Sequence, residues 1–233
     1  MTFAASFAGV ILAAGESSRM GRDKALLPWP PLATGQAPSS ETFLSAAIRS
    51  LAPATDFVVV VVGKNEAALV PIIYSQGASL VVNRDPDRGQ FSSLQVGLQE
   101  VLNHGRDAAM VTLVDRPPVS LATLQTLRHA FSVADPNVWA IVPEFSGQHG
   151  HPYLVGREMM AAFLQVPATS IARDVEHAHQ EHIQYVPVDD PLVALNVNTP
   201  EDYAGLTARV LTGHASLRRV VCASLPKHVI VDR

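Results

Sequence analysis

The residues with the clearest potential for chemistry lie between Val10 and Lys24. The stretch reads VILAAGESSRMGRDK: an apolar run of strand length ends at Gly15, and small polar residues, Arg19 and Lys24 follow. A buried strand that opens into a glycine-containing loop can turn several consecutive N–H groups toward an anion. Arg19 and Lys24 would add positive charge to such a loop. The stretch therefore predicts a phosphate-binding loop.

Two common phosphate-binding loops are excluded by their spacing. The Walker loop has four residues between its glycines and a Lys-Ser/Thr pair after the second, whereas five residues separate Gly15 from Gly21 and Arg22 follows. The G-x-G-x-x-G motif of dinucleotide-binding proteins is absent. A secretory signal is disfavoured because no Lys or Arg precedes Arg19. A strand, loop and helix without a ligand is the alternative that remains.

The stretch resembles the LAAGxSxRMGxxK signature of nucleotidyltransferases related to the molybdenum-cofactor cytidylyl- and guanylyltransferases. The resemblance implies that backbone N–H groups from Ala14 to Ser18 hold the β- and γ-phosphates of a nucleoside triphosphate. It also implies that Arg19 balances the leaving pyrophosphate and that Lys24 stabilises charge on the α-phosphate. Within the family, LAAG accompanies CTP and LAGG accompanies GTP, so a cytosine base is expected. The nucleotide-binding residues implied here are Leu12, Ala13, Ala14, Gly15, Glu16, Ser17, Ser18, Arg19 and Lys24.

Two oxygen-bearing side chains are candidates for a divalent metal. Asp115 directly follows the apolar run 109–114, and a carboxylate at the end of a central strand suits Mg²⁺, which prefers oxygen ligands and keeps waters while bridging phosphates. The segment resembles the family's D-x-P motif, although the family more often has Gln or His where Arg116 stands. Residues 195–203, LNVNTPEDY, resemble D-x-D-T-P-E-D with both leading aspartates replaced by Asn. The resemblance thus predicts that Asp115 and Asn198 hold Mg²⁺, in a site with one negative charge fewer than that of the family. Helix capping by Asn198 is the structural alternative.

Two further segments resemble substrate-binding stretches of the family. RGQFSSLQVGL, residues 88–98, resembles the segment that lines the base and ribose and implies Gly89, Ser92 and Ser93 as nucleotide-binding residues. A capped helix and nothing more is the alternative. GHPYLVGR, residues 150–157, resembles the stretch over the acceptor, where His151 either contacts the acceptor phosphate or orders the loop. A zinc site on His177, His179 and His182 is disfavoured because residues two apart do not share a helix face, so solvated histidines are expected.

The elements that must position these residues alternate along the chain. Apolar strand-like runs occur at 9–13, 57–62, 80–82, 109–114 and 138–142, and helix-like stretches at 41–51, 65–75, 91–102 and 121–131. Nearly continuous apolar strands are typical of parallel sheets buried on both faces. The alternation predicts a doubly wound, mostly parallel α/β sheet of the Rossmann-like type, with ligands at the carboxyl ends of its strands. Residues 28–40 hold four prolines and predict a surface loop at the rim of the site.

Length and charge limit the remaining possibilities. A chain of 233 residues suits one domain, expected at 1–210, with a tail at 211–233. Its net charge of −4 offers no basic field for binding a nucleic acid, and no apolar run is long enough to span a bilayer. The lone Cys222 fits a reducing compartment. A cytoplasmic protein is therefore expected.

The resemblance implies transfer of a nucleotidyl group, expected to be CMP from CTP, to a phosphorylated acceptor, expected to be molybdopterin. A sugar- or polyol-phosphate nucleotidyltransferase is the alternative enzyme. A nucleotide-binding protein without turnover is the alternative suggested by Asn196 and Asn198.

Overall fold

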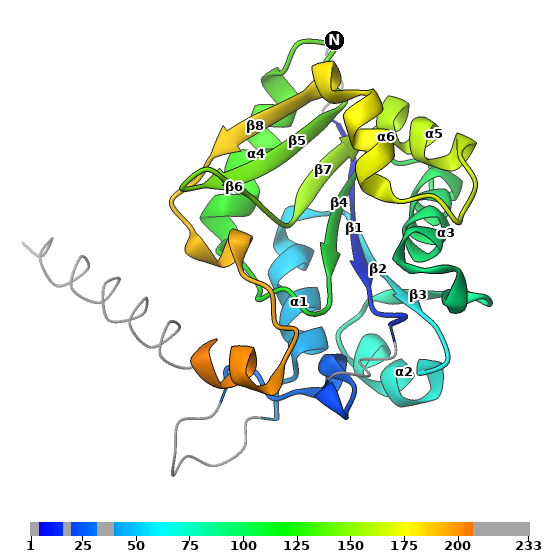
Figure 1. The fold of residues 1–233 in the computed structure, drawn as a ribbon, viewed down its shortest axis with the longest axis vertical. Helices are drawn as coiled ribbons and strands as arrows, with labels where there is room; N and C mark the ends of the chain where they lie inside the picture. The colour runs from blue at the N-terminus through cyan, green and yellow to red at the C-terminus, as the bar shows by residue number, and fades with distance from the viewer. Residues whose placement is uncertain (1–4, 16–19, 32–39, 207–233) are drawn as a thin grey trace, which may run out of the picture.

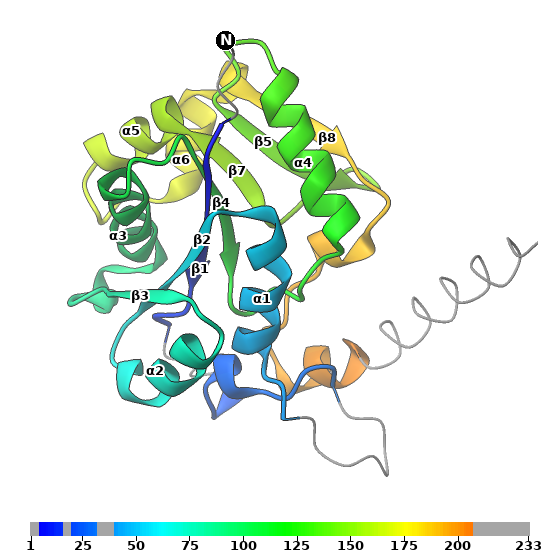
Figure 2. The ribbon, with the colours of Figure 1, turned by 180° about the vertical axis from the view of Figure 1, so that it is seen from behind.

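The computed structural model describes residues 5–15, 20–31 and 40–206. Within these ranges the chain forms one eight-stranded sheet with helices on both faces (Figures 1 and 2). The strand order is β3-β2-β1-β4-β7-β5-β6, and β8 pairs with β5. Strands β3, β2, β1 and β4 are mutually parallel, as are β5 and β8, whereas β7 and β6 run antiparallel to their neighbours. The predicted mostly parallel α/β fold is confirmed.

The strands are β1 (Phe7–Leu12), β2 (Phe57–Val62), β3 (Ser79–Val82), β4 (Ala108–Leu113), β5 (Ala140–Phe145), β6 (Gln148–His149), β7 (Tyr153–Gly156) and β8 (Ile183–Pro187). The α-helices between residues 40 and 199 are α1 (Phe43–Leu51), α2 (Glu66–Ser75), α3 (Gln90–Asn103), α4 (Leu121–Val133), α5 (Arg157–Gln165) and α6 (Ala172–Ala178). A further helix begins at residue 200 and continues to residue 206, the last residue described. None of the helices in the described ranges is long and apolar enough to cross a membrane.

Side-chain alternation along the central strands builds one hydrophobic core on each face of the sheet. In β2, Val58, Val60 and Val62 pack toward α1, α2 and α4, while Val59 and Val61 pack toward α3 and α5. Figure 2 shows the first group of helices in front of the sheet, and Figure 1 shows α3, α5 and α6 from the other side. Because successive strand side chains point to opposite faces, a fully apolar strand is buried on both.

Gly97 lets α3 lie close to the sheet. A Cβ atom at this position would lie 2.7 Å from Val10 Cγ1 and 2.9 Å from Val61 Cγ2. The close approach carries the amino-terminal end of α3, and Gly89 before it, to the edge where β1 and β4 end. Gly97 therefore has a packing role that supports the site.

A third, smaller core lies at this edge and corrects the prediction for residues 28–40. Trp29 is only 9% exposed and meets Phe43 edge to face, with ring centroids 5.0 Å apart. The backbone N–H of Trp29 donates to the Glu41 carbonyl at 2.8 Å. Val197 packs in the same cluster. The start of the segment is therefore buried structure that joins the loop after β1 to the segment around residue 197; residues 32–39 lie outside the described ranges.

Candidate active site

The loop after β1 is tied to the sheet before it reaches Lys24. The Asn65 side-chain amide donates to the Ala13 carbonyl at 2.9 Å and to an Asp23 carboxylate oxygen at 2.7 Å. The other carboxylate oxygen of Asp23 caps a short 3-10 helix, Lys24–Leu26. Sequence reasoning missed Asn65, because an amide just beyond a strand carries no chemical signature of its own. These bonds place Lys24 at the carboxyl edge of the sheet.

Asp115 lies two residues beyond the end of β4 and contacts Lys24 directly. Lys24 Nζ donates to Asp115 Oδ2 at 3.0 Å, and the two side chains are only 11% and 21% exposed. The second oxygen, Oδ1, is buried and has no hydrogen-bond partner in the described part of the chain. A buried carboxylate oxygen without a donor costs free energy. Its environment therefore favours a bound cation or a donor from a ligand.

Asn198 completes the cluster, and its role differs from the helix cap that its spacing suggested. The cap is Thr199: its Oγ1 accepts from the Asp202 N–H at 3.2 Å, and the Asp202 carboxylate accepts from the N–H groups of Thr199 and Asn198 at 2.9 Å each. These two backbone bonds lower the pKa of Asp202. Since the capping box lies one residue later, the Asn198 side chain is available to accept from Lys24 Nζ at 3.1 Å. The Val197 N–H also donates to the Asp115 carbonyl at 3.0 Å, which holds the two segments together.

The donor set of this cluster suits a hard divalent cation. Asp115 and Asn198 present oxygen atoms to one point, where Lys24 places its ammonium group. Mg²⁺ needs few protein ligands when phosphates and waters supply the others. Among the residues described, no group of three or more His, Cys, Asp or Glu side chains offers a metal site that would need no substrate ligands. The residues therefore fit a metal that shares its coordination with a phosphorylated ligand.

A cavity of about 170 Å³ lies beside this cluster, where the resemblance places the nucleotide. Ala14, Gly15, Gly89 and Ser93 line it together with Lys24. Gly89 has φ +99°, a backbone conformation that favours glycine, and it precedes the first turn of α3.

Ser92 does not line this cavity, although the resemblance places it beside Ser93 in the nucleotide site. Its hydroxyl donates to the Gly89 carbonyl at 2.7 Å and accepts from the Asn83 amide at 2.9 Å. The same amide donates to Ser93 Oγ at 3.0 Å. In this structure Ser92 helps to hold the start of α3, and Ser93 faces the cavity.

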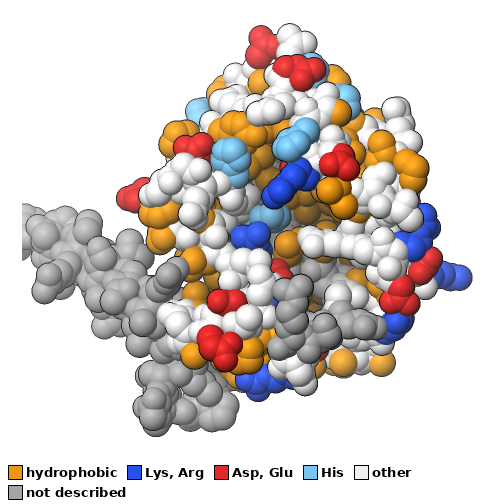
Figure 3. Space-filling model, in the orientation of Figure 1, with side chains coloured by type: hydrophobic (Ala, Val, Ile, Leu, Met, Phe, Trp, Pro, Cys, Tyr) orange, Lys and Arg blue, Asp and Glu red, His pale blue; other side chains and the backbone are white. Residues whose placement is uncertain are grey.

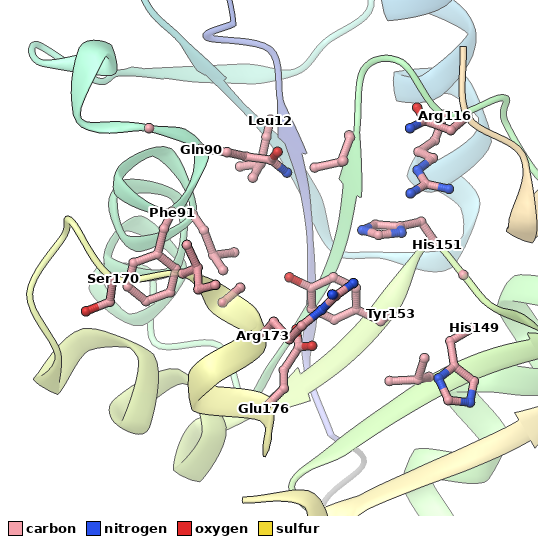
Figure 4. A pocket seen from close by; sticks show the side chains of 18 of the residues that line it. Leu12, Gln90, Phe91, Arg116, His149, His151, Tyr153, Ser170, Arg173 and Glu176 are labelled. Carbon is pink, nitrogen blue, oxygen red and sulfur yellow. The ribbon is translucent and has the colours of Figure 1, made fainter. Parts of the chain in front are cut away.

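A larger cavity of about 820 Å³ opens on the other side of Asp115. Figure 3 shows histidine and basic side chains gathered around a hollow in the middle of this face. In Figure 4, Arg116 lies beside His151 at one end, while Tyr153, Arg173 and Glu176 lie together farther into the cavity. Asp115, together with Leu12, Gly89, Gln90 and Leu113, lines both cavities. The two spaces therefore meet at the residues proposed for chemistry.

His151 and Arg116 share one end of the large cavity but differ in charge. Burial and the neighbouring Arg116 cation lower the pKa of His151 to about 3, so its imidazole is neutral at pH 7. Its Nδ1 atom is buried without a hydrogen-bond partner in the described chain. Arg116 Nη1 donates to the Leu195 carbonyl at 3.0 Å, and its buried Nε has no described partner. Burial lowers the pKa of Arg116, while the nearby Asp115 raises it. Arg116 is therefore the cation at this end of the cavity.

Several lining residues were not predicted from the sequence. Tyr153 on β7 and Arg173 and Glu176 on α6 line the large cavity, and none of their side chains makes a hydrogen bond within the described ranges. Burial raises the pKa of Glu176. A lone Glu in a helix usually lies on a solvated face, so the sequence offered no signal for it.

Two of the three histidines near residue 180, His179 and His182, are less solvated than predicted, whereas His177 is exposed. His182 stacks on Trp139 with ring centroids 3.7 Å apart and an angle of 4° between planes, and His179 lies 5.3 Å from the same indole. His177 lines the large cavity instead. The histidine spacing thus reflects packing around an indole and the cavity rim. The remaining predicted nucleotide-binding residues, Glu16, Ser17, Ser18 and Arg19, lie outside the described ranges.

Comparison with known proteins identifies the family of this chain. Residues 9–183 match the family model described as the MobA-like NTP transferase domain. The chain is 30% identical over 201 residues to a probable molybdenum cofactor guanylyltransferase of Rhodopirellula baltica, covering 83% of this chain and 88% of the relative. It is 25% identical over 196 residues to the molybdenum cofactor cytidylyltransferase of Escherichia coli, covering 83% and 92%.

A solved structure shares the fold across nearly its whole length. The structure of Rv0371C from Mycobacterium tuberculosis H37Rv, in complex with manganese, superposes with a TM-score of 0.67 at 25% identity and covers 87% of this chain and 98% of that one. The family match spans the strands and helices that carry Lys24 and Asp115. The chain belongs to the MobA-like NTP transferase family and is a nucleotidyltransferase.

Proposed function

We propose that this chain transfers a nucleotidyl group, CMP in the first instance, from a nucleoside triphosphate to the terminal phosphate of molybdopterin. The observation that carries the proposal is the position of Asp115 and its partner Lys24 where two cavities meet. The smaller cavity lies against the loop whose sequence matches the triphosphate-binding signature. The larger one has the volume for a bicyclic acceptor with a phosphate group, within the usual range for small-molecule sites.

The reaction is a displacement at phosphorus. An oxygen of the acceptor phosphate attacks the α-phosphorus of the NTP, the bond between the α-phosphorus and the bridging oxygen breaks, and pyrophosphate leaves. Such chemistry depends on positioning and charge neutralisation more than on a covalent side-chain nucleophile. Bound Mg²⁺, held by Asp115 and Asn198, would neutralise charge on the triphosphate.

The side chains of this cluster fit those requirements. Lys24 lies 3.0 Å from Asp115 Oδ2 and lines the nucleotide cavity, so its ammonium group would neutralise charge on an α-phosphate bound there. Arg116 provides the cation at the end of the acceptor cavity nearest Asp115, which suits the acceptor phosphate. His151 is neutral there, so we assign it to orienting the loop and donating a single hydrogen bond.

The choice of base rests on Ala14. Ala14 is 7% exposed and lines the nucleotide cavity. A methyl group at this position reduces the space for a base, which favours the smaller cytosine over guanine. The relatives from Rhodopirellula baltica and Escherichia coli differ in their base, since the first is named a probable guanylyltransferase and the second a cytidylyltransferase.

The test is pyrophosphate release by the purified protein with Mg²⁺, each of CTP and GTP, and molybdopterin. We expect release with CTP that requires the acceptor and falls at least 100-fold in Asp115→Ala. Absence of release across both nucleotides would refute turnover. The loss of negative charge at Asn196 and Asn198 favours one specific alternative, a protein that binds the nucleotide without transfer. Tight CTP binding with Mg²⁺ and no pyrophosphate would support that alternative.

A further inference from the structure

The far end of the large cavity carries polar groups that the transfer reaction does not use. Tyr153, Arg173 and Glu176 line it, away from Arg116 in Figure 4. None of the three side chains makes a hydrogen bond within the described ranges. Arg173 is the charged residue that acts most strongly on Glu176, but the two side chains do not form an ion pair within 4 Å. Tyr153 and Glu176 are half-buried and Arg173 is exposed, so this end of the cavity presents their polar groups to a bound ligand.

The charge of Glu176 limits what that ligand can be. A carboxylate accepts hydrogen bonds and donates none, so the part of the acceptor that lies against Glu176 must present N–H or O–H donors. A phosphate group would be repelled from it and belongs at the opposite end, beside Arg116. The cavity thus has one end for an anion and one end for a donor-rich group.

Aromatic rings in the same cavity favour a flat donor-rich group. Phe91 and Tyr153 line the space, and the rings of His149 and Tyr185 stack on each other 3.9 Å apart at its border. Flat apolar walls with a few polar groups suit a planar heterocycle. An aminopyrimidinone is a planar group that offers a carboxylate two parallel N–H donors, through its ring N–H and its exocyclic amino group.

We propose that Glu176 is the residue that selects the acceptor, by accepting two N–H hydrogen bonds from the aminopyrimidinone edge of a fused-ring substrate. This inference rests on the proposed function for the phosphate end of the acceptor. Arg173, three residues earlier on α6, lies over the same end of the cavity and offers donors to the ring carbonyl beside that edge. Burial raises the pKa of Glu176, and the neighbouring Arg173 cation opposes that rise and favours the carboxylate form.

The experiment compares two pteridines that differ at one group. Pterin carries an amino group at position 2 and lumazine carries a carbonyl there, so a carboxylate matches pterin and a side-chain amide matches lumazine. Both probes are fluorescent, and their binding to the full chain is followed by titration without any nucleotide. We expect the wild type to bind pterin at least tenfold more tightly than lumazine, and Glu176→Gln to invert that preference.

The matched control is Glu158→Gln, which makes the same change in charge on the exposed first turn of α5 and should keep the wild-type preference. Because the measured quantity is a ratio within each protein, partial loss of folded material in a variant does not affect it. Equal binding of the two pteridines by the wild type, no binding of either, or an unchanged preference in Glu176→Gln would overturn the proposal. Tighter binding of a polyol phosphate than of pterin would also overturn it. Since no transfer is measured, these results are distinct from a failure to release pyrophosphate.

Discussion

Replacing Lys24 with Met should weaken catalysis and strengthen metal binding at the same time. Lys24 Nζ occupies the point between Asp115 Oδ2 and Asn198 Oδ1, at 3.0 and 3.1 Å. These are the two side chains assigned to the metal. A divalent cation must therefore displace the ammonium group before it binds both oxygens. Met keeps the length and apolar stem of the side chain and removes the charge.

The two effects have different sizes. A hydrogen bond to a charged group contributes about 1.5–3 kcal/mol, and partial exposure of the pair places the net value at the lower end. Since 1.36 kcal/mol corresponds to a factor of ten, Mn²⁺ should bind the nucleotide-free variant about tenfold more tightly than the wild type. Removing one preorganised group that stabilises transition-state charge lowers kcat by about 10²–10³.

The assay titrates Mn²⁺ into each protein without nucleotide, with free Mn²⁺ followed by electron paramagnetic resonance, and measures pyrophosphate release in parallel. Arg22→Met is the matched control, because it removes a cation from the same loop on an exposed side chain. Its Mn²⁺ affinity should stay close to that of the wild type. Unchanged or weaker Mn²⁺ binding by Lys24→Met would refute the idea that the ammonium and the metal share one site.

Three further changes test the fold and the base preference. Gly150→Ala places a Cβ atom 2.1 Å from the Val193 carbonyl oxygen, and overpacking of about 1–3 kcal/mol should lower Tm in a thermal melt by about 2 to 12 °C; an unchanged Tm would contradict the packing. Hydrogen bonds from Ser6 lower the pKa of Asp107 below 3.8, so its stabilising contribution is present above that pH and is lost as the pH falls through the folded-state pKa. The Tm difference between wild type and Asp107→Asn should therefore shrink between pH 7 and pH 3, and a constant difference would argue against it. Ala14→Gly enlarges the nucleotide cavity and should shift the ratio of kcat/KM for CTP over GTP toward GTP by about tenfold or more, as expected when one methyl group sets the fit.

The central half of the fold was predictable because its strands are buried on both faces. The strand β2, in which five valines follow Phe57, matched the predicted bounds, and β4 differed from its predicted bounds by one residue at each end. Of the other four strands, β5 was predicted in part, as the run 138–142. Strands β6, β7 and β8 were not predicted, because β6 and β7 have only two and four residues and β8 lies at the margin of the sheet with exposed positions. Such segments carry neither a long apolar run nor a clear alternation. Their pairing depends on the partner strands.

The same distinction applies to the site. Lys24 and Asp115 follow motifs that mark them individually, but their contact joins residues 91 positions apart and is set by the parallel pairing of β1 with β4. The role of Asn198 depends on a capping box shifted by one residue, which the spacing T-P-E-D allows but does not specify. Glu176 has no motif, and only the folding of α6 over the cavity gives it a role.

The most direct test of the proposed chemistry is a crystal structure of the protein with Mn²⁺ and CTP, with the metal located by its anomalous scattering. We expect one anomalous peak within coordinating distance of Asp115 and Asn198, in contact with the triphosphate, and Lys24 turned from Asp115 toward the α-phosphate. A metal that contacts neither side chain, or a triphosphate bound away from the loop between Ala14 and Lys24, would contradict it.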